Sequence, residues 1–354
     1  MVRGHGREPS RSQQKYARRK LARMQPRGEI PGAGAGRQAS GGFAAAAAAP
    51  RTAAPSAHAA VAYRTADEYA RAVGGFLQTG LDASEPVMAA VPAPRADLIR
   101  NYLGVRSARV SFAEMRTLGQ NPARIIPAIQ AFADSHPGQL LHYVGEPDWP
   151  SRTAPERAEV MRHEALLNVA FHGRPVKILC AYDAGGLGAA VIAQAERAHP
   201  VLMRNGDVTR NPGFAGAWPP SAADRALASP PAGLRVLTYR DDPAAARRFA
   251  RQMASAAGLA EPRLTDLVIA VGELAANTLR HTRGSGSVRV WAEAGEVVCE
   301  VRDSGHIQDA LAGRRYPATD AGRGHGLWVV HQVCDLVEMR TSPAGTVFRL
   351  HMGL

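Results

Sequence analysis

The sequence predicts an α/β protein built from two domains, one over residues 65–200 and one over residues 234–354. Between residues 65 and 200, short apolar runs alternate with helical patterns, which is typical of a mostly parallel sheet. Residues 201–233 contain five prolines among glycines and alanines, and we interpret this stretch as a linker. A chain of 354 residues is long enough to bury two sizeable cores.

The first domain is predicted to begin with a helix and to continue as alternating strands and helices. Thr65 and Glu68 form the pattern of a capping box before a helix that runs through Leu77. The expected strands are 86–91, 108–112, 140–144 and 176–181, and the expected helices are 94–103, 124–135, 155–171 and 187–198. No G-x-x-x-x-G-K-[ST] motif occurs in the sequence, so this domain is not a P-loop enzyme.

Residues 1–60 are predicted to form a disordered tail, because a basic stretch, a Gly/Ser-rich stretch and an alanine run cannot build a core. Residues 1–40 carry ten basic and two acidic residues, so they account for eight of the formal net charge of +12. The other 314 residues therefore carry only +4. Because the folded part is only mildly basic, we expect no sequence-specific binding of nucleic acid.

The second domain is predicted to start with a strand at 234–239 and a basic helix at 243–257. A helix follows at 263–282, where apolar residues recur at spacings of three and four. Two strands are expected at 287–292 and 297–302. An apolar run at 327–337 predicts one further helix, and a last strand follows the Gly345-Thr346 pair.

Within the helix at 263–282, Glu273 and Asn277 are four residues apart and share a face that is not the apolar one. Asn277 there could give Mg²⁺ an oxygen ligand, and Glu273 could orient or deprotonate a nucleophile. Taken alone, the pair also fits an ordinary solvated helix face.

Asp303-Ser-Gly305 ends the second of the two strands. The carboxylate of Asp303 could accept a hydrogen bond from an exocyclic amine such as that of adenine, and Gly305 would let the backbone approach the base. About fifteen turn-rich residues, 306–321, follow and are long enough to form a flexible lid. An ordinary Asp-x-Gly turn is the alternative interpretation.

Gly322, Gly324 and Gly326 alternate directly before a helix, where backbone N–H groups and the positive helix end can face phosphates. A dinucleotide-binding site would need a strand before these glycines, but a loop precedes them, so that alternative fails.

As a set, these motifs resemble the ATPase domain shared by gyrase, Hsp90, histidine kinases and MutL (GHKL), over roughly residues 234–354. Glu273 and Asn277 match its N box, Asp303 and Gly305 its adenine motif, and the three glycines its lid. The ending after Gly345, with Thr346 as a further ATP-binding residue, looks most like the anti-sigma-factor serine kinases of the RsbW type. One departure is Ile307, which stands where the family often has a second glycine.

The resemblance implies a fold, cofactors and partners. The fold would be a two-layer α/β sandwich, and the cofactors would be ATP and Mg²⁺. The domain would sequester a sigma factor and phosphorylate a serine or threonine of an anti-anti-sigma (STAS) partner, and it would be able to form a homodimer. A basic helix face made by Arg247, Arg248 and Arg251 could meet an acidic sigma factor, or it could be a solvated face.

Strings at 143–150, 162–168 and 179–183 resemble the MEDS sensory domain, named from the DcmR regulator, over roughly residues 65–200. This domain precedes the kinase-like domain in anti-sigma regulators of the RsbA type, and it is thought to sense small molecules. Glu146, Trp149, His163 and Glu164 could line its pocket, or Trp149 could pack in the core while His163 and Glu164 make surface contacts.

The remaining signals concern the compartment. No apolar run reaches the ~18 residues that a membrane span needs, and the start lacks the apolar core of a secretory signal, so we expect no membrane association. Cys180, Cys299 and Cys334 fit neither a disulfide framework nor a zinc site, and we interpret them as small buried side chains in a cytoplasmic protein.

Two functions from other classes stay open. Sensor histidine kinases carry a His-Glu pair on their phosphoacceptor helix, so His163, followed by Glu164, could be the phosphoacceptor. However, a predicted strand and a proline-rich linker separate this pair from the ATPase domain. A sequestration module without kinase activity is the other alternative, and Ile307 favours it.

Overall fold

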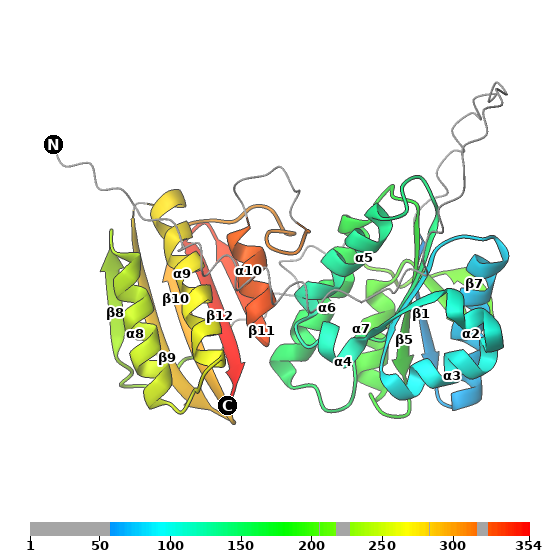
Figure 1. Ribbon diagram of the computed structural model, residues 1–354, viewed down its shortest axis with the longest axis horizontal. Coiled ribbons are helices and arrows are strands. Elements are labelled where there is room, and N and C mark those ends of the chain that lie inside the picture. Colours follow the sequence, from blue (N-terminus) through cyan, green and yellow to red (C-terminus); the bar gives the residue numbers. More distant parts are fainter. Residues whose placement is uncertain (1–56, 205, 217–226, 283, 317–324) are drawn as a thin grey trace, which may run out of the picture.

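The computed structural model describes residues 57–204, 206–216, 227–282, 284–316 and 325–354. Two α/β domains lie side by side (Figure 1), which confirms the predicted fold class. The predicted tail up to residue 56, linker residues 217–226, and the glycines Gly322 and Gly324 lie outside the described residues.

The N-terminal domain is a seven-stranded sheet in the order β3-β2-β4-β5-β1-β6-β7, parallel except for the β6–β7 pair. Its strands are β1 (Ala57–Tyr63), β2 (Val87–Val91), β3 (Val110–Glu114), β4 (Leu141–Gly145), β5 (Val176–Asp183), β6 (Val201–Arg204) and β7 (Asp207–Arg210). Its helices are α2 (Ala66–Asp82), α3 (Ala93–Leu103), α4 (Met115–Leu118), α5 (Ile125–Asp134), α6 (Ala154–Ala170) and α7 (Ala189–Ala198), with the 3₁₀ turns η1 (Gly104–Arg109) and η2 (Pro122–Arg124).

Helices cover both faces of this sheet, as a parallel sheet requires. On β2, alternate side chains serve the two faces: Ala89 packs with residues of α2 and α3, whereas Met88 packs with residues of α5, α6 and α7. Both clusters are apolar, so the sheet lies between two cores.

Strand β1 corrects the predicted tail, because Ala57–Tyr63 lies between β5 and β6 inside the sheet. Alanines make up four of its seven residues, and alanine is depleted in strands, so the local pattern gave no strand signal. The small side chains suit a strand that is covered on both faces. The domain therefore begins before Thr65.

The hairpin of β6 and β7 corrects the predicted start of the linker at residue 201. Val201 to Met203 extend the sheet beside β1, and β7 pairs with β6 in antiparallel register. Two strands of four residues are too short for a periodic pattern to reveal them.

The C-terminal domain is a five-stranded antiparallel sheet with three helices on one face, the two-layer sandwich that the resemblance implied. Its strands, in the sheet order β11-β12-β10-β9-β8, are β11 (Leu336–Ser342), β12 (Gly345–Gly353), β10 (Glu296–Asp303), β9 (Ser285–Glu293) and β8 (Val236–Arg240). The helices are α8 (Pro243–Ala256), α9 (Arg263–His281) and α10 (Gly326–Val333).

The single helix predicted over 327–337 is wrong in its second half, because α10 ends at Val333 and β11 begins at Leu336. The end of α10 is held by side chains of the N-terminal domain. Arg124 donates to the carbonyl oxygens of His331 and Cys334 at 2.9 and 2.6 Å. These partners are distant in sequence, so the local apolar pattern could not show where the helix stops.

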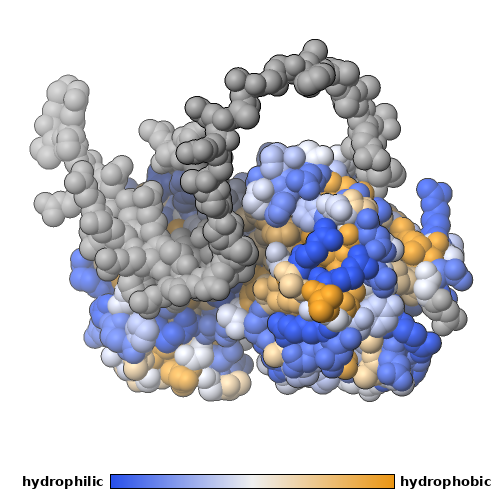
Figure 2. All heavy atoms as spheres, turned by 45° about the vertical axis from the view of Figure 1, so that its right-hand side comes forward, coloured by the Kyte–Doolittle hydropathy of each residue, from blue (hydrophilic) through white to orange (hydrophobic). Residues whose placement is uncertain are grey.

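The two domains meet where α6 and η2 approach α10 and β11 (Figure 1). Most of the described surface visible in Figure 2 is hydrophilic, with smaller hydrophobic patches between. Among the described residues, no helix combines the length and apolar character needed to cross a membrane.

Candidate functional site: a cradle between α9, α10 and the end of β10

Helix α9 places Glu273 and Asn277 on the side that faces the start of α10. A Cβ atom added to Gly326 would lie 2.8 Å from Oε2 of Glu273 and 3.5 Å from Nδ2 of Asn277. The backbone of Gly326 therefore touches both side chains, and any larger residue there would displace Glu273. The third glycine of the predicted loop and the N-box pair come together as expected.

The carboxylate of Asp303 is fixed by two donors. The backbone N–H of Gly305 donates to Oδ1 at 2.8 Å, and the hydroxyl of Thr278 on α9 lies 2.8 Å from Oδ2. The hydroxyl of Tyr239 lies 2.9 Å from Oγ1 of Thr278. Thr278 thus ties the N-box helix to the Asp303 turn.

Sequence analysis missed Thr278 and Tyr239. Thr278 is fully buried and follows Leu274 at a spacing of four, so it interrupts the apolar face of α9. A polar residue on an otherwise apolar helix face can be recognised in the sequence as a candidate for a specific hydrogen bond. Tyr239 on β8 carried no such signal, because a strand tyrosine is ordinary.

Thr346 stands opposite Asp303 in the β10–β12 register. Its hydroxyl donates to the carbonyl of Gly305 at 2.7 Å and lies 2.8 Å from the hydroxyl of Thr341, which accepts the N–H of Ile307 at 2.9 Å. This chain of hydrogen bonds holds the turn from Asp303 to Ile307 against β11 and β12.

Gly345 permits this arrangement. Its φ is +138°, and a Cβ atom there would lie 2.4 Å from the carbonyl oxygen of Asp303. Ile307, in contrast, has no positive φ, and its side chain packs against the C-terminal core. The replacement of a second glycine by Ile307 therefore puts no strain on the turn.

Electrostatics at Glu273 suit a group that accepts a proton. Its burial raises the pKa above the usual range, although Arg280, Arg247 and His325 nearby lower it. Arg280 is exposed one turn beyond Asn277 and donates to its Oδ1 at 3.5 Å, so a positive charge lies beside the position where an anionic ligand would bind.

The residues fit a nucleotide with its metal ion. A side chain at position 326 would fill the space that Gly326 leaves beside Glu273. Thr278, the residue after Asn277 on α9, holds the carboxylate of Asp303 in place. Asn277 offers the amide oxygen that Mg²⁺ accepts. The individual roles of Glu273, Asn277, Asp303, Gly305, Gly326 and Thr346 stay predictions.

The segment after the Asp303 turn reaches the N-terminal domain. Leu311 is 2% exposed and packs in the core cluster of that domain, and the N–H of Tyr316 donates to Oε1 of Gln130 on α5 at 3.0 Å. The predicted flexible lid, 306–321, therefore has a first part that is packed between the domains. The rest of it, 317–321, lies outside the described residues.

A buried ion-pair network centres on Glu159 of α6. Its carboxylate pairs with Arg314, which lies in the segment after the Asp303 turn, and with Arg340 of β11, the latter at 3.2 Å. Although burial disfavours the ionised form, the guanidinium groups of Arg314, Arg162 and Arg340 hold the pKa of Glu159 below its usual range. The network joins α6 to the segment that follows the Asp303 turn and to strand β11 of the other domain.

The four residues predicted to line one sensory pocket have separate surroundings. Glu146 accepts from the hydroxyl of Tyr63 at 2.8 Å, and burial raises its pKa to about 7. The ring of Trp149 lies 3.5 Å from the guanidinium of Arg152. His163 is buried, which lowers its pKa to about 4.

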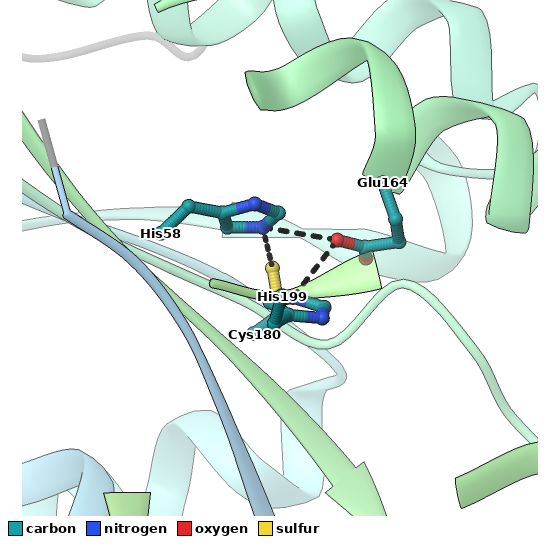
Figure 3. A group of neighbouring side chains, drawn as sticks. All are labelled: His58, Glu164, Cys180 and His199. Carbon is teal, nitrogen blue, oxygen red and sulfur yellow. Dashed lines mark hydrogen bonds and ion pairs between the residues drawn. The ribbon is translucent and has the colours of Figure 1, made fainter. Parts of the chain in front are cut away.

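Glu164 instead belongs to a group with His58, Cys180 and His199 (Figure 3), and sequence analysis missed this group. His58 lay in the predicted tail, and Cys180 was interpreted as a small buried side chain only. Because the strand that carries His58 was not predicted, His58 could not be grouped with the other three residues.

Comparison with known families agrees with both domains. Residues 57–200 match the model of the MEDS domain, described as the MEthanogen/methylotroph, DcmR Sensory domain. Residues 240–352 match the histidine kinase-like ATPase domain. No curated protein matched the chain.

Together, the fold and the cradle define a regulatory, kinase-like protein of the ATP-binding class. More particularly, the chain joins an N-terminal MEDS sensory domain to a C-terminal GHKL-type ATPase domain.

Proposed function

We propose that this protein is an anti-sigma regulator whose C-terminal domain binds ATP with Mg²⁺, sequesters a sigma factor and phosphorylates a serine or threonine of a STAS partner. The observation that carries the proposal is the convergence of Glu273, Asn277 and Gly326, together with Thr278 holding Asp303 on the next position of the same helix. One rigid helix thereby serves both ends of a nucleotide.

The nucleotide would supply the γ-phosphoryl group, which Mg²⁺ helps to neutralise. Asp303 would accept the exocyclic amine of adenine, Asn277 would hold the metal ion, and Gly326 would bring backbone N–H groups to the phosphates. The partner's hydroxyl oxygen would bond to the γ-phosphorus while the bond to the β–γ bridging oxygen breaks. Glu273 would take the hydroxyl proton, and ADP would leave.

An acidic partner would fit helix α8. Arg248 and Arg251 are exposed and form ion pairs with the exposed carboxylates of Asp242 and Glu261, at 3.2 and 2.9 Å. Exposed pairs of this kind contribute little, about 0–1 kcal/mol, so a sigma factor's carboxylates would replace them at small cost. Arg247 lies closer to the cradle, against Gly272.

Control by the sensory domain would act through residues 306–316. This segment follows Asp303 directly, and its side chains Leu311 and Arg314 are buried against the N-terminal domain. A change in that domain would therefore alter the position of the adenine turn.

A sensor histidine kinase is disfavoured, because His163 is 1% exposed and a buried ring cannot receive a phosphoryl group from a separate domain. A sequestration module without kinase activity stays a second candidate, because Ile307 fills the place of a glycine.

Calorimetry of ATP·Mg²⁺ binding to the full chain tests the proposal, with Asn277→Ala beside the exposed helix control Asn101→Ala. We expect micromolar binding that Asn277→Ala abolishes and Asn101→Ala leaves intact. Absence of binding by the folded wild type would contradict the proposal. Binding without acid-stable phosphate transfer to any STAS protein would favour the sequestration module.

A further inference from the structure

Four side chains of three chemical types meet in the interior of the N-terminal domain (Figure 3). They are His58 on β1, Glu164 on α6, Cys180 on β5 and His199 just after α7. One ligand atom from each lies within 4.8 Å of the others. None of the four is more than 4% exposed, so no water layer separates them.

The hydrogen bonds fix which ring nitrogen of His199 carries a proton. Nδ1 lies 2.7 Å from the carbonyl oxygen of Ala195, which can only accept, so Nδ1 is the N–H. In the neutral ring, Nε2 therefore presents a lone pair, and it lies 3.2 Å from Oε2 of Glu164. Nε2 makes no hydrogen bond to the described residues.

Hydrogen bonds also determine which ring nitrogen of His58 carries a proton. The amide nitrogen of Asn168 donates to the carbonyl oxygens of Glu164 and Ala198 at 3.3 and 3.0 Å, which leaves Oδ1 as an acceptor. Nδ1 of His58 lies 3.1 Å from that oxygen and is therefore the N–H. Its Nε2 lone pair points at Oε2 of Glu164, 3.1 Å away, and lies 3.4 Å from Sγ of Cys180.

Two imidazole lone pairs and a carboxylate oxygen thus converge, with one thiol proton to share among them. Oε1 of Glu164 is also buried without a hydrogen bond to the described part of the chain. Buried acceptors that face one another without donors are costly. A cation at their centre would satisfy them all at once.

We propose that His58, Glu164, Cys180 and His199 form a binding site for a single divalent transition ion, of which zinc is the best match. Two imidazole nitrogens, a thiolate and a carboxylate are the ligand types that Zn²⁺ takes in tetrahedral sites, whereas Mg²⁺ and Ca²⁺ prefer oxygen alone. Ligand bonds of about 2.0–2.3 Å in a tetrahedron place the ligand atoms roughly 3.3–3.8 Å apart. The separations from Nε2 of His58 to Oε2 of Glu164 and Sγ of Cys180, and from Oε2 to Nε2 of His199, are 3.1–3.4 Å and near that range, and all four ligand atoms lie within 4.8 Å of one another.

The surroundings have the features of a built metal site. Both histidines donate their other N–H to an oxygen acceptor, the arrangement that fixes the tautomer of metal-binding histidines. All four ligands come from this chain and are buried, so no coordination position is left for a substrate. Such an ion would support structure or sensing and would not act in catalysis.

The site goes beyond the proposed function and does not depend on it. Because Glu164 lies on α6, the proposed site is connected to the contact between the two domains. Glu164 is on the same helix as Glu159, which pairs with Arg314 and Arg340 of the C-terminal domain. The ion would fix α6 at Glu164, and Glu159, five residues earlier on the same helix, contacts the other domain.

Metal analysis of the full chain tests the proposal. We expect about one zinc ion per chain after purification without added metal. After chelation and titration with Co²⁺, a thiolate-to-metal charge-transfer band is expected from Cys180. The near-isosteric Cys180→Ser should abolish this band and lower metal content, while the matched buried control Cys299→Ser should leave both unchanged.

His199→Ala serves as a second variant, with His142→Ala, a buried histidine that pairs with Glu85, as its control. We expect only His199→Ala to lose the ion. The band in the wild type is informative even where a variant does not fold. A folded wild type that binds neither Zn²⁺ nor Co²⁺, or a band that persists in folded Cys180→Ser, would overturn the assignment.

Discussion

Glu159 of the sensory domain and Arg314 of the ATPase domain form an ion pair that is almost fully buried, with both side chains 1% exposed. Arg314 belongs to the segment that follows the Asp303 turn, and Glu159 belongs to the helix that also carries Glu164. The pair therefore links the nucleotide cradle to the interior of the sensory domain.

Removing the carboxylate should be costly. Glu159→Ala would leave Arg314 buried without the counter-charge of Glu159, and breaking a buried pair in this way costs about 3–5 kcal/mol. Urea unfolding of the full chain measures the loss. Asp97→Ala, which breaks the exposed pair with Arg100, is the control and should cost less than about 1 kcal/mol. An equal loss in the free energy of unfolding for the two substitutions would show that the buried pair stabilises the protein no more than an exposed pair does.

Asp303→Asn tests the adenine contact. The substitution replaces a charged acceptor, worth about 1.5–3 kcal/mol per hydrogen bond, so we expect the affinity for ATP to fall about tenfold or more. Asp309→Asn is a suitable control, because Asp309 lies in the same segment, where its carboxylate pairs with the exposed Arg315 and its Oδ1, which the amide keeps, accepts the N–H of Leu311. Titration calorimetry with ATP and GTP should also show that the wild type prefers ATP. Unchanged ATP affinity in Asp303→Asn would place adenine elsewhere.

Gly326→Ala should weaken nucleotide binding through Glu273. The new Cβ atom would lie 2.8 Å from Oε2 of Glu273, so the carboxylate has to move, and such overpacking costs about 1–3 kcal/mol. Gly75→Ala in α2 is the matched control, because a Cβ atom there meets nothing within 4 Å. It should stabilise the helix by roughly 0.5–1 kcal/mol. ATP affinity and melting temperature, measured together, separate a local effect from unfolding.

Much of the C-terminal site could be predicted, because its residues lie in short segments with their own spacing. Glu273 and Asn277 are one helical turn apart, and Asp303 ends a regular strand, so the neighbours in sequence determine their setting. Thr278 was also visible as a polar break in an apolar face. Gly326 was placed correctly at the start of α10, but the end of that helix depends on Arg124 from the other domain.

The group around Glu164 could not be predicted, for physical reasons that differ from residue to residue. His58 lies on an alanine-rich strand that has no local strand signal and is stable only between β5 and β6. Cys180 comes close to His58 through the pairing of β5 with β1, and His199 lies in the turn between α7 and β6. Nothing in these separate segments indicates that they meet. Glu164 was among the predicted pocket residues, but its partners His58 and His199 were not.

The outer face of the C-terminal sheet predicts a dependence of stability on pH. His351 on β12 lies between Glu296 and Glu338, at 3.0 and 3.2 Å. Although burial opposes the charged ring, these two hydrogen bonds raise its pKa to about 9 from 6.5. A raised pKa stabilises the folded state fully below pH 6.5, and this contribution disappears as the pH rises towards 9. Urea midpoints at pH 6 and pH 9.5 measure the change. His351→Gln should flatten it, and a slope as steep as that of the wild type would assign the dependence to another group.

Removal of the proposed ion should destabilise the sensory domain and alter the cradle together. A structural ion binds the folded state alone, so chelation removes its contribution and should lower the melting temperature by at least about 5 °C. Because Glu164 and Glu159 share α6, the chelated chain should also bind ATP with changed affinity. Differential scanning calorimetry and ATP titration of the same sample, before and after chelation, give the two readouts. Re-addition of Zn²⁺ should restore both, and Cys180→Ser should respond to neither treatment. A melting shift without any change in ATP affinity would leave the ion as a stabiliser of the N-terminal domain and would exclude α6 as the connection between the two sites.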